Sequence, residues 1–146
     1  MSDVNLERTV EFLARVPLFR NLKKKQLQSL ARAVVSRQYK VGEELVEQGK
    51  GGIGLFVIVS GKTEAIHTRI DGTEVIVNTF GPTDFFGELA VLNDKPRTAS
   101  VVAIEDTECL VLVRWELFGK LRQDPEMAIV ILQELTERFQ RALAVL

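Results

Sequence analysis

The most informative stretch of this chain for its fold and function is residues 85–99, FFGELAVLNDKPRTA. It interrupts a strand-like region, because residues 88–92 favour about one helical turn before Asn93, Asp94 and Pro96 stop it. A sheet does not require a helix at this point, and the first backbone N–H groups of such a turn have no partners within it. Together with the helix dipole, those groups favour a bound anion.

Three side-chain positions in this stretch support a site for a small anion. Gly87 has no side chain to block a ligand that approaches the backbone, and Arg97 carries a planar fork that suits two oxygens of a phosphate or carboxylate. Glu88 would repel a bare anion, but it suits a ligand with hydroxyl groups beside the phosphate, as in a ribose phosphate. The alternative interpretation is that Glu88 caps the short helix and that Arg97 pairs with Glu88 or Asp94.

Around this stretch, the hydrophobic pattern divides the chain into three blocks. Residues 1–33 carry apolar residues at helical spacing, and so do residues 115–146. Residues 34–114 instead contain a series of short apolar or alternating runs, separated by turn signals such as Ser60-Gly61 and Asp71-Gly72. This pattern predicts a mainly β structure, a sandwich or jelly roll, with helices at both ends.

The last block predicts two helices. A short helix begins at Trp115, and Pro125 opens a second one as a first-turn residue. The second helix carries a heptad seam of apolar residues, spaced 4, 3, 4, 3 and 4 apart: Ala128, Leu132, Leu135, Phe139, Ala142 and Leu146. The seam is compatible both with packing against the helix's own domain and with pairing to a second copy of the chain.

Composition excludes several classes of protein. With 146 residues, 46% hydrophobic and 27% charged, the chain resembles one ordinary globular domain. Its formal net charge of −1 argues against a generally basic nucleic-acid or membrane-surface binder, although it allows a local basic pocket. The sequence contains no signal peptide and no apolar run of about 20 residues, so we expect a cytoplasmic protein.

The single cysteine and the single histidine exclude most metal chemistry. One cysteine cannot form an intrachain disulfide or hold a multi-cysteine zinc or iron–sulfur site, and Cys109 lies in an apolar run typical of a core. One histidine is too few for a cupin-type metal site, and we expect His67 at the surface of a strand. We therefore expect no metal, no cofactor and no catalytic activity.

In residues 86–99, FGELA is followed after six residues by RTA, and this arrangement resembles the phosphate-binding cassette of cyclic nucleotide-binding domains. That family includes the catabolite activator protein, the regulatory subunits of cAMP-dependent protein kinase and the cyclic nucleotide-gated channels. The flanking sequence is similar as well: residues 16–19 to the family's N-terminal helical segment, and residues 47–49 and 55–61 to its early strands.

The resemblance implies a single domain over residues 1–146. Within it, residues 1–33 would form the N-terminal helices, and residues 34–114 a jelly-roll β-roll that contains the cassette, residues 86–99, with its short helix. Residues 115–146 would form the hinge helix and the C-helix.

The resemblance also implies a role for each site residue. Glu88 would accept a hydrogen bond from the ribose 2′-hydroxyl, and Arg97 would pair with the exocyclic oxygens of the cyclic phosphate. The backbone N–H groups of Ala90 and Thr98 would also reach the phosphate, and Gly87 would let the sugar approach. The complete implied set of nucleotide-binding residues is Gly87, Glu88, Leu89, Ala90, Arg97, Thr98, Val59, Val77, Phe80 and Arg138.

Part of that set belongs to the base rather than to the phosphate. Val59, Val77 and Phe80 would line the base pocket, and the C-helix would cover the base. Arg138 would lie near the ribose-binding glutamate. The alternative for Arg138 is an ordinary surface pair with Glu134, four residues before it.

Two positions depart from the family's pattern. Thr83 stands where many members have a glycine in the turn before the cassette, and we expect Gly81 to relieve that turn. Residues 50–52 lack an aspartate that is often found there. Neither departure touches an implied ligand contact.

Thr98 is compatible with both cAMP and cGMP, and the similarity to bacterial sensors favours cAMP slightly.

The function implied by the resemblance is that of a non-catalytic sensor of a 3′,5′-cyclic nucleotide, such as the effector domain of a bacterial transcription regulator. The helix over residues 128–146 would join two chains in a homodimer. Because no helix-turn-helix segment follows and the charge is not basic, we do not expect this chain to bind DNA or a membrane by itself. The alternative is a degenerate member that acts as a protein-interaction or dimerisation module without nucleotide.

Overall fold

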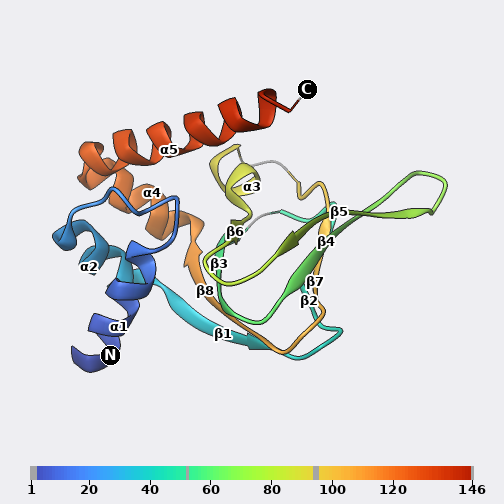
Figure 1. The fold of residues 1–146 in the computed structure, drawn as a ribbon, viewed down its shortest axis with the longest axis horizontal. Helices are drawn as coiled ribbons and strands as arrows, with labels where there is room; N and C mark the ends of the chain where they lie inside the picture. The colour runs from blue at the N-terminus through green and yellow to red at the C-terminus, as the bar shows by residue number, and fades with distance from the viewer. Residues whose placement is uncertain (1–2, 52, 94–95, 146) are drawn as a thin grey trace. The chain divides into compact units, whose positions relative to one another are not determined.

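The computed structural model describes residues 3–51, 53–93 and 96–145 (Figure 1). The chain forms two compact units. One consists of the segments Met1–Ala33 and Trp115–Leu146, and the other is Val34–Arg114. The first unit is helical and the second holds every strand of the described residues.

The second unit is a β-roll made of two four-stranded antiparallel sheets. The first sheet has the order β1 (Val35–Tyr39), β8 (Thr107–Val113), β3 (Gly54–Ser60) and β6 (Phe85–Phe86). The second has the order β2 (Glu44–Val46), β7 (Ser100–Ala103), β4 (Thr63–Thr68) and β5 (Glu74–Phe80). The mainly β jelly-roll architecture predicted from the turn signals is confirmed.

The core of the roll is built from alternate residues of both sheets, as expected for strands with one buried face. Phe86 lies stacked between two other rings, with ring centroids 5.0 Å from Phe56 and 5.1 Å from Phe80. The buried cluster around these rings comprises Phe56, Ile58, Ala65, Phe80, Phe86, Val101, Cys109 and Val111. Cys109 is thus a core residue, as its apolar run predicts.

Among the described residues, the helical unit contains four helices: α1 (Asp3–Ala14), α2 (Lys24–Ala33), α4 (Arg114–Gln123), which begins at the last residue of the roll, and α5 (Pro125–Leu143). Helix α2 buries one face, which consists of Leu27, Leu30 and Ala31. Between α1 and α2 the chain makes short turns, and Leu18 and Phe19 are buried there. The helices expected at both ends of the chain are therefore confirmed.

Helix α5 begins where the sequence predicts. The side chain of Asp124 accepts a hydrogen bond from the backbone N–H of Met127 at 3.2 Å, and Pro125 takes the first turn. The amide of Gln26 in α2 donates a second hydrogen bond to Asp124 at 3.0 Å. This cap therefore fixes both the start of α5 and its contact with α2.

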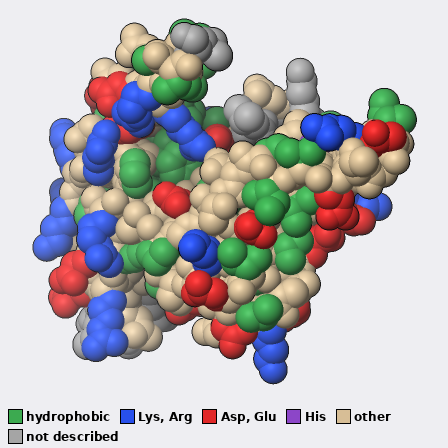
Figure 2. All heavy atoms as spheres, turned by 45° about the vertical axis from the view of Figure 1, so that its right-hand side comes forward, with side chains coloured by type: hydrophobic (Ala, Val, Ile, Leu, Met, Phe, Trp, Pro, Cys, Tyr) green, Lys and Arg blue, Asp and Glu red, His purple; other side chains and the backbone are tan. Residues whose placement is uncertain are grey.

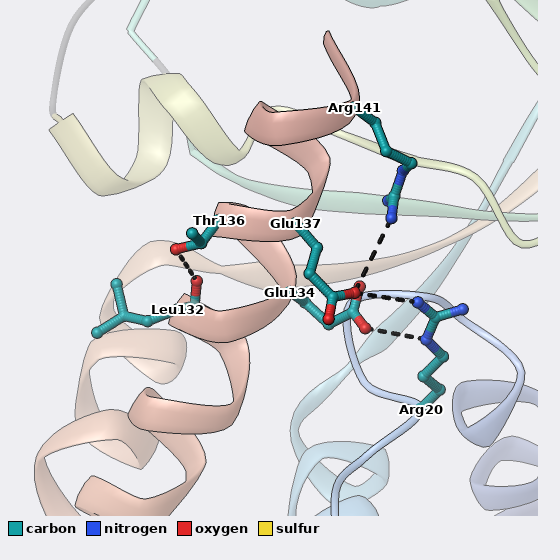
Figure 3. Close-up of polar contacts among 6 residues, drawn as sticks. All are labelled: Arg20, Leu132, Glu134, Thr136, Glu137 and Arg141. Atoms are coloured by element: carbon teal, nitrogen blue, oxygen red, sulfur yellow. Dashed lines mark hydrogen bonds and ion pairs between the residues drawn. The ribbon is translucent and has the colours of Figure 1, made fainter. Parts of the chain in front are cut away.

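The buried face of α5 includes a carboxylate (Figure 3). Glu134 is only 4% exposed, and its Oε1 lies 2.9 Å from Nε of Arg20, a residue of the turns between α1 and α2. The same guanidinium lies 3.7 Å from Glu137, one turn further toward the solvent. Arg20 therefore joins the N-terminal segment to α5 through a charge-assisted hydrogen bond.

The exposed side of α5 carries a row of large apolar residues, which we call the α5 stripe: Ile129, Leu132, Phe139 and Leu143. Leu132 and Phe139 belong to the predicted heptad seam and are 61% and 63% exposed. Leu135, another seam residue, is half-buried, and Leu146 lies outside the described residues. Within the described part of the chain, no helix is long and apolar enough to cross a membrane.

Candidate functional site

Helix α3 (Glu88–Asn93) follows directly on β6, at the position predicted for a single helical turn. Gly87 precedes it with φ +93°, a conformation that glycine adopts without steric cost. The backbone N–H of Val91 donates to the Gly87 carbonyl at 3.1 Å, and Nε of Arg114 donates to the Val91 carbonyl at 2.9 Å. The first of these is the opening hydrogen bond of the helix itself, and the second holds the middle of the helix to Arg114, the residue that follows β8.

Arg97 is the one arginine or lysine among the buried residues of the described chain, and it is 7% exposed. Its Nη2 donates a hydrogen bond to the Gly54 carbonyl of β3 at 2.9 Å, and its guanidinium carbon lies 5.9 Å from the ring centroid of Phe56. Its Nε is buried and has no hydrogen-bond partner among the described residues. The guanidinium is thus held on one side and retains a free donor on another.

The electrostatic surroundings of Arg97 combine two opposing effects. Burial lowers the pKa of Arg97 below its ordinary value, and the nearby carboxylate of Glu88 raises it. Since an arginine remains protonated in proteins, the charge persists in a site where water cannot fully solvate it. Both interpretations of Glu88 remain open. Glu88 interacts electrostatically with Arg97, and Nε of Arg97 has no hydrogen-bond partner among the described residues.

The backbone of Arg97 is fixed by the loop that follows β2. Gly49 N–H donates to the Arg97 carbonyl, and Arg97 N–H donates to the Lys50 carbonyl, both at 2.8 Å. The backbone N–H of Gln48 donates to the hydroxyl of Ser100 at 2.9 Å. Apolar spacing does not predict these contacts, because they join segments that are far apart along the chain.

The predicted base-pocket residues occupy three different environments. Val59 is half-buried near the end of β3. Val77 is 55% exposed and is the extra residue of a β-bulge, because Ala65 pairs with Asn78 while Ile66 pairs with Ile76. Phe80 is buried and stacked on Phe86 inside the core cluster, and its place beside the base stays a prediction.

The remaining predicted residues are also placed. Thr98 is exposed, Glu88 is half-buried, and the side chains of Leu89 and Ala90 lie outside what the structure describes. Arg138 belongs to the helical unit, so its proximity to the ribose-binding glutamate stays a prediction. Glu134, the partner of Arg138 in the alternative interpretation, is buried and hydrogen-bonded to Arg20.

The turn before the cassette corrects one expectation. Thr83 itself takes the left-handed conformation, with φ +72°, whereas Gly81 does not. Thr83 N–H donates to the Ile58 carbonyl at 2.9 Å, and Ile58 N–H donates to the backbone carbonyl of Asp84 at 2.9 Å. Because these hydrogen bonds hold Thr83 and Asp84 against β3, the backbone keeps its shape and the threonine bears the steric cost.

In the face drawn in Figure 2, Lys and Arg side chains gather on the left, and Asp and Glu side chains are scattered over the rest. Among the described residues, no group of His, Cys, Asp and Glu is arranged to hold a metal ion. The charged donor that the structure offers to an anion at this site is the buried guanidinium of Arg97.

The sequence profile of the cyclic nucleotide-binding domain matches residues 36–124, which contain Gly87, Glu88 and Arg97. The chain belongs to the cyclic nucleotide-binding domain family. Members of this family are non-catalytic regulatory sensor domains. The recognition made from the cassette is therefore confirmed at the level of the family.

Curated relatives include two kinds of regulator. A cAMP-dependent protein kinase regulatory subunit of Dictyostelium discoideum is 37% identical over 114 residues, 76% of this chain and 35% of that protein. The cyclic AMP receptor protein of Thermus thermophilus is 32% identical over 126 residues, 86% of this chain and 58% of that protein. The cyclic nucleotide-binding domain described here thus spans between about a third and three-fifths of the length of these relatives.

Solved structures show the same fold. The N-terminal domain of a transcriptional regulator from Streptomyces coelicolor has a TM-score of 0.78 and 31% identity, covering 90% of this chain and 94% of that one. The regulatory subunit of a cAMP-independent protein kinase A from Trypanosoma brucei has a TM-score of 0.78 and 27% identity, covering 96% and 52%. The same architecture thus occurs in regulators of two different kinds.

Proposed function

We propose that this chain binds a 3′,5′-cyclic nucleotide in its β-roll and acts as a regulatory sensor domain. The observation that carries the proposal is the buried guanidinium of Arg97, whose Nε has no partner in the described structure. A buried charge with an unmade hydrogen bond is costly, and an anionic ligand that accepts from Nε offsets that cost. Two exocyclic oxygens of a cyclic phosphate match the planar fork of an arginine.

For the rest of the site we propose the roles that the family resemblance implies. Glu88 accepts from the ribose 2′-hydroxyl, Gly87 lets the sugar approach, and the N–H groups of Ala90 and Thr98 reach the phosphate. Val59, Val77 and Phe80 would line the base side. On nucleotide binding, α5 would cover the base and Arg138 of this helix would lie near the ribose.

The ligand that we favour is cAMP, with cGMP second. Two curated relatives that are 32% and 37% identical are named for cAMP, which supports this order. The hydroxyl of Thr98 is exposed and available to either base. Nucleotide binding would shift the positions of α4 and α5, and its effect would be limited by the difference in affinity for the two states. The likeness to the N-terminal domain of a transcriptional regulator supports an effector-domain role of this type.

We further propose that the chain forms a homodimer through α5. The α5 stripe supports this, because it places four large apolar side chains on the exposed side of one helix at coiled-coil spacing. A second copy of α5 would cover the α5 stripe with an apolar surface of the same length.

Isothermal titration calorimetry with cAMP and with cGMP tests the proposed function. We expect the parent to bind, and Arg97→Ala to weaken binding roughly 30-fold or more, the scale for truncating a buried charge partner. Arg37→Ala, on an exposed residue of β1, is the matched control and should leave affinity unchanged. Urea unfolding of each variant shows that it is folded.

Two results contradict the proposal in different ways. A parent that binds neither nucleotide favours the alternative of a module that acts through protein contacts alone. This outcome has a counterpart among the relatives, one of which regulates a kinase named as cAMP-independent. A parent that binds, together with a folded Arg97→Ala variant that binds equally well, places the nucleotide away from Arg97.

A further inference from the structure

The single histidine of the chain contacts the cassette. His67 lies on β4, and its Nδ1 is 2.7 Å from the backbone carbonyl oxygen of Thr98, the residue after Arg97. A carbonyl oxygen only accepts hydrogen bonds, so Nδ1 is the donor and carries the proton, while Nε2 of the neutral ring remains an acceptor. The surface role expected for His67 from the sequence therefore misses a specific contact.

This contact continues a strand pairing beyond the point at which it ends. The pairing of β4 with β7 runs from Thr63 and Ala103 to Ile66 and Ser100. The imidazole of His67 reaches one step further along the same direction and takes the carbonyl of Thr98. A side chain thus replaces the backbone donor that a longer strand would have supplied.

The end of β4 that carries His67 is itself fixed. The side-chain amide of Gln48 donates to the Thr68 carbonyl at 2.9 Å and accepts from Thr68 N–H at 2.8 Å. Its backbone N–H donates to the hydroxyl of Ser100 at 2.9 Å. Gln48 therefore joins the residue after His67 to the start of β7, which limits the positions that the imidazole can take.

The two contacts act on consecutive carbonyl groups of the cassette. Gly49 N–H takes the carbonyl of Arg97, and His67 takes that of Thr98. The peptide between Arg97 and Thr98 carries the carbonyl of Arg97 and the N–H of Thr98, and the hydrogen bond from Gly49 holds it directly. His67 holds the carbonyl of the next peptide, so the two hydrogen bonds together fix the backbone on both sides of Thr98, and without His67 it is held on one side only.

We propose that His67 is a positioning residue of the nucleotide site, which orients the Arg97–Thr98 segment before the ligand binds. The inference rests on the proposed function, because it assigns His67 a role toward the same ligand. The physical basis is preorganisation: a segment that is already ordered loses less conformational freedom on binding. Without the imidazole, the carbonyl of Thr98 loses a donor and the segment gains alternative conformations.

The test compares a variant that keeps the donor with one that removes it. In His67→Asn, the side-chain amide places an N–H near the position of Nδ1, whereas His67→Ala has no donor. Val75→Ala is the matched control, because Val75 pairs with His67 across β4 and β5 and its side chain is not part of the contact with Thr98. Calorimetry with cAMP and cGMP gives affinity, and urea unfolding gives stability.

We expect His67→Ala to weaken nucleotide binding roughly 3- to 10-fold, the range for one net hydrogen bond. His67→Asn should stay within about 2-fold of the parent, and Val75→Ala should change stability without changing affinity. A purely structural role would lower stability in His67→Ala and leave the affinity of the folded protein unchanged, which would overturn the proposal. Equal loss in His67→Ala and His67→Asn would also overturn it.

Nitrogen NMR gives a readout that does not depend on the ligand. The chain has one histidine, so its ring gives one pair of nitrogen signals. We expect the neutral ring to carry its proton on Nδ1, and a proton on Nε2 instead would refute the contact. If the parent binds neither nucleotide, the proposed function and this inference both fail. If the parent binds and His67→Ala binds equally well, only this inference fails.

Discussion

Gly87 and Arg97 fit together so closely that a Cβ atom on Gly87 would overlap Nη1 of Arg97. The same Cβ would lie 2.9 Å from the Gly54 carbonyl oxygen, which accepts from Nη2 of the arginine. Both the φ of Gly87 and the space beside it therefore require glycine. The position of the Arg97 guanidinium therefore depends on the absence of a side chain at Gly87, ten residues earlier and directly before α3.

Gly87→Ala should therefore displace the guanidinium and abolish or strongly weaken nucleotide binding. Gly72→Ala is the matched control: Gly72 has φ +89°, close to that of Gly87, but a Cβ there would meet nothing within 4 Å. The left-handed alanine costs each variant roughly 1 kcal/mol, and only Gly87→Ala should also lose affinity by calorimetry. Equal affinity in the two variants would show that the position of Arg97 does not depend on Gly87.

Thr83→Gly should stabilise the chain by roughly 0.5–1 kcal/mol. Glycine takes φ +72° without the steric cost that a β-branched residue bears, and its larger loss of conformational entropy on folding offsets part of that gain. Thr83→Ala keeps most of the cost and serves as the control. Urea unfolding measures both. The prediction fails if glycine gives no more stability than alanine at this position.

Features that depend on local pattern were predictable from the sequence. The helical period, the turn dipeptides and Pro125 locate the helices and the roll, because each of these signals acts within a few residues. The motif at residues 86–99 likewise identifies Arg97 as the candidate anion-binding residue, because all residues of the motif lie within one short segment of the chain. The conformation of Thr83 was not predictable, because hydrogen bonds to the distant strand β3 decide it.

Contacts between distant segments account for most of what the sequence did not show. Arg20 and Glu134 are 114 positions apart, and His67 and Thr98 are 31 apart. The α5 stripe differs from the heptad seam for a related reason. Which face of α5 is exposed depends on what the rest of its unit buries, and the spacing of apolar residues does not reveal this.

Arg20→Ala should destabilise the chain by about 2 kcal/mol, because Glu134 would remain buried without its charged donor. Arg141→Ala is the control, since Arg141 and Glu137 form an exposed pair at 3.9 Å that should contribute less than about 0.5 kcal/mol. Adding Glu134→Leu to Arg20→Ala should recover stability by removing the unpaired carboxylate. Similar small losses in the free energy of unfolding of both arginine variants would show that Arg20 does not stabilise the buried carboxylate of Glu134.

Cys109 should make stability depend on pH above about 9. Burial, with a smaller contribution from Glu108, raises the pKa of the thiol to about 12. The unfolded chain therefore loses this proton first as the pH rises, and stability falls between the two pKa values. Relative to Cys109→Ala, the parent should lose about 1.5 kcal/mol from pH 8 to pH 10 and nothing below pH 8. The difference between parent and variant should be followed by urea unfolding, and a difference that is constant with pH would contradict the prediction.

Leu132→Glu combined with Phe139→Glu should convert a dimer into a monomer. Both side chains are more than half exposed on the α5 stripe, so the charges are tolerated in the single chain and are opposed only where a second apolar helix covers them. We expect self-association to weaken roughly 100-fold or more in sedimentation velocity. Gln133→Glu adds the same charge at an exposed position outside the stripe and should leave association unchanged. A parent that sediments as a monomer, or a double variant that remains dimeric, would show that α5 does not join two copies of this chain.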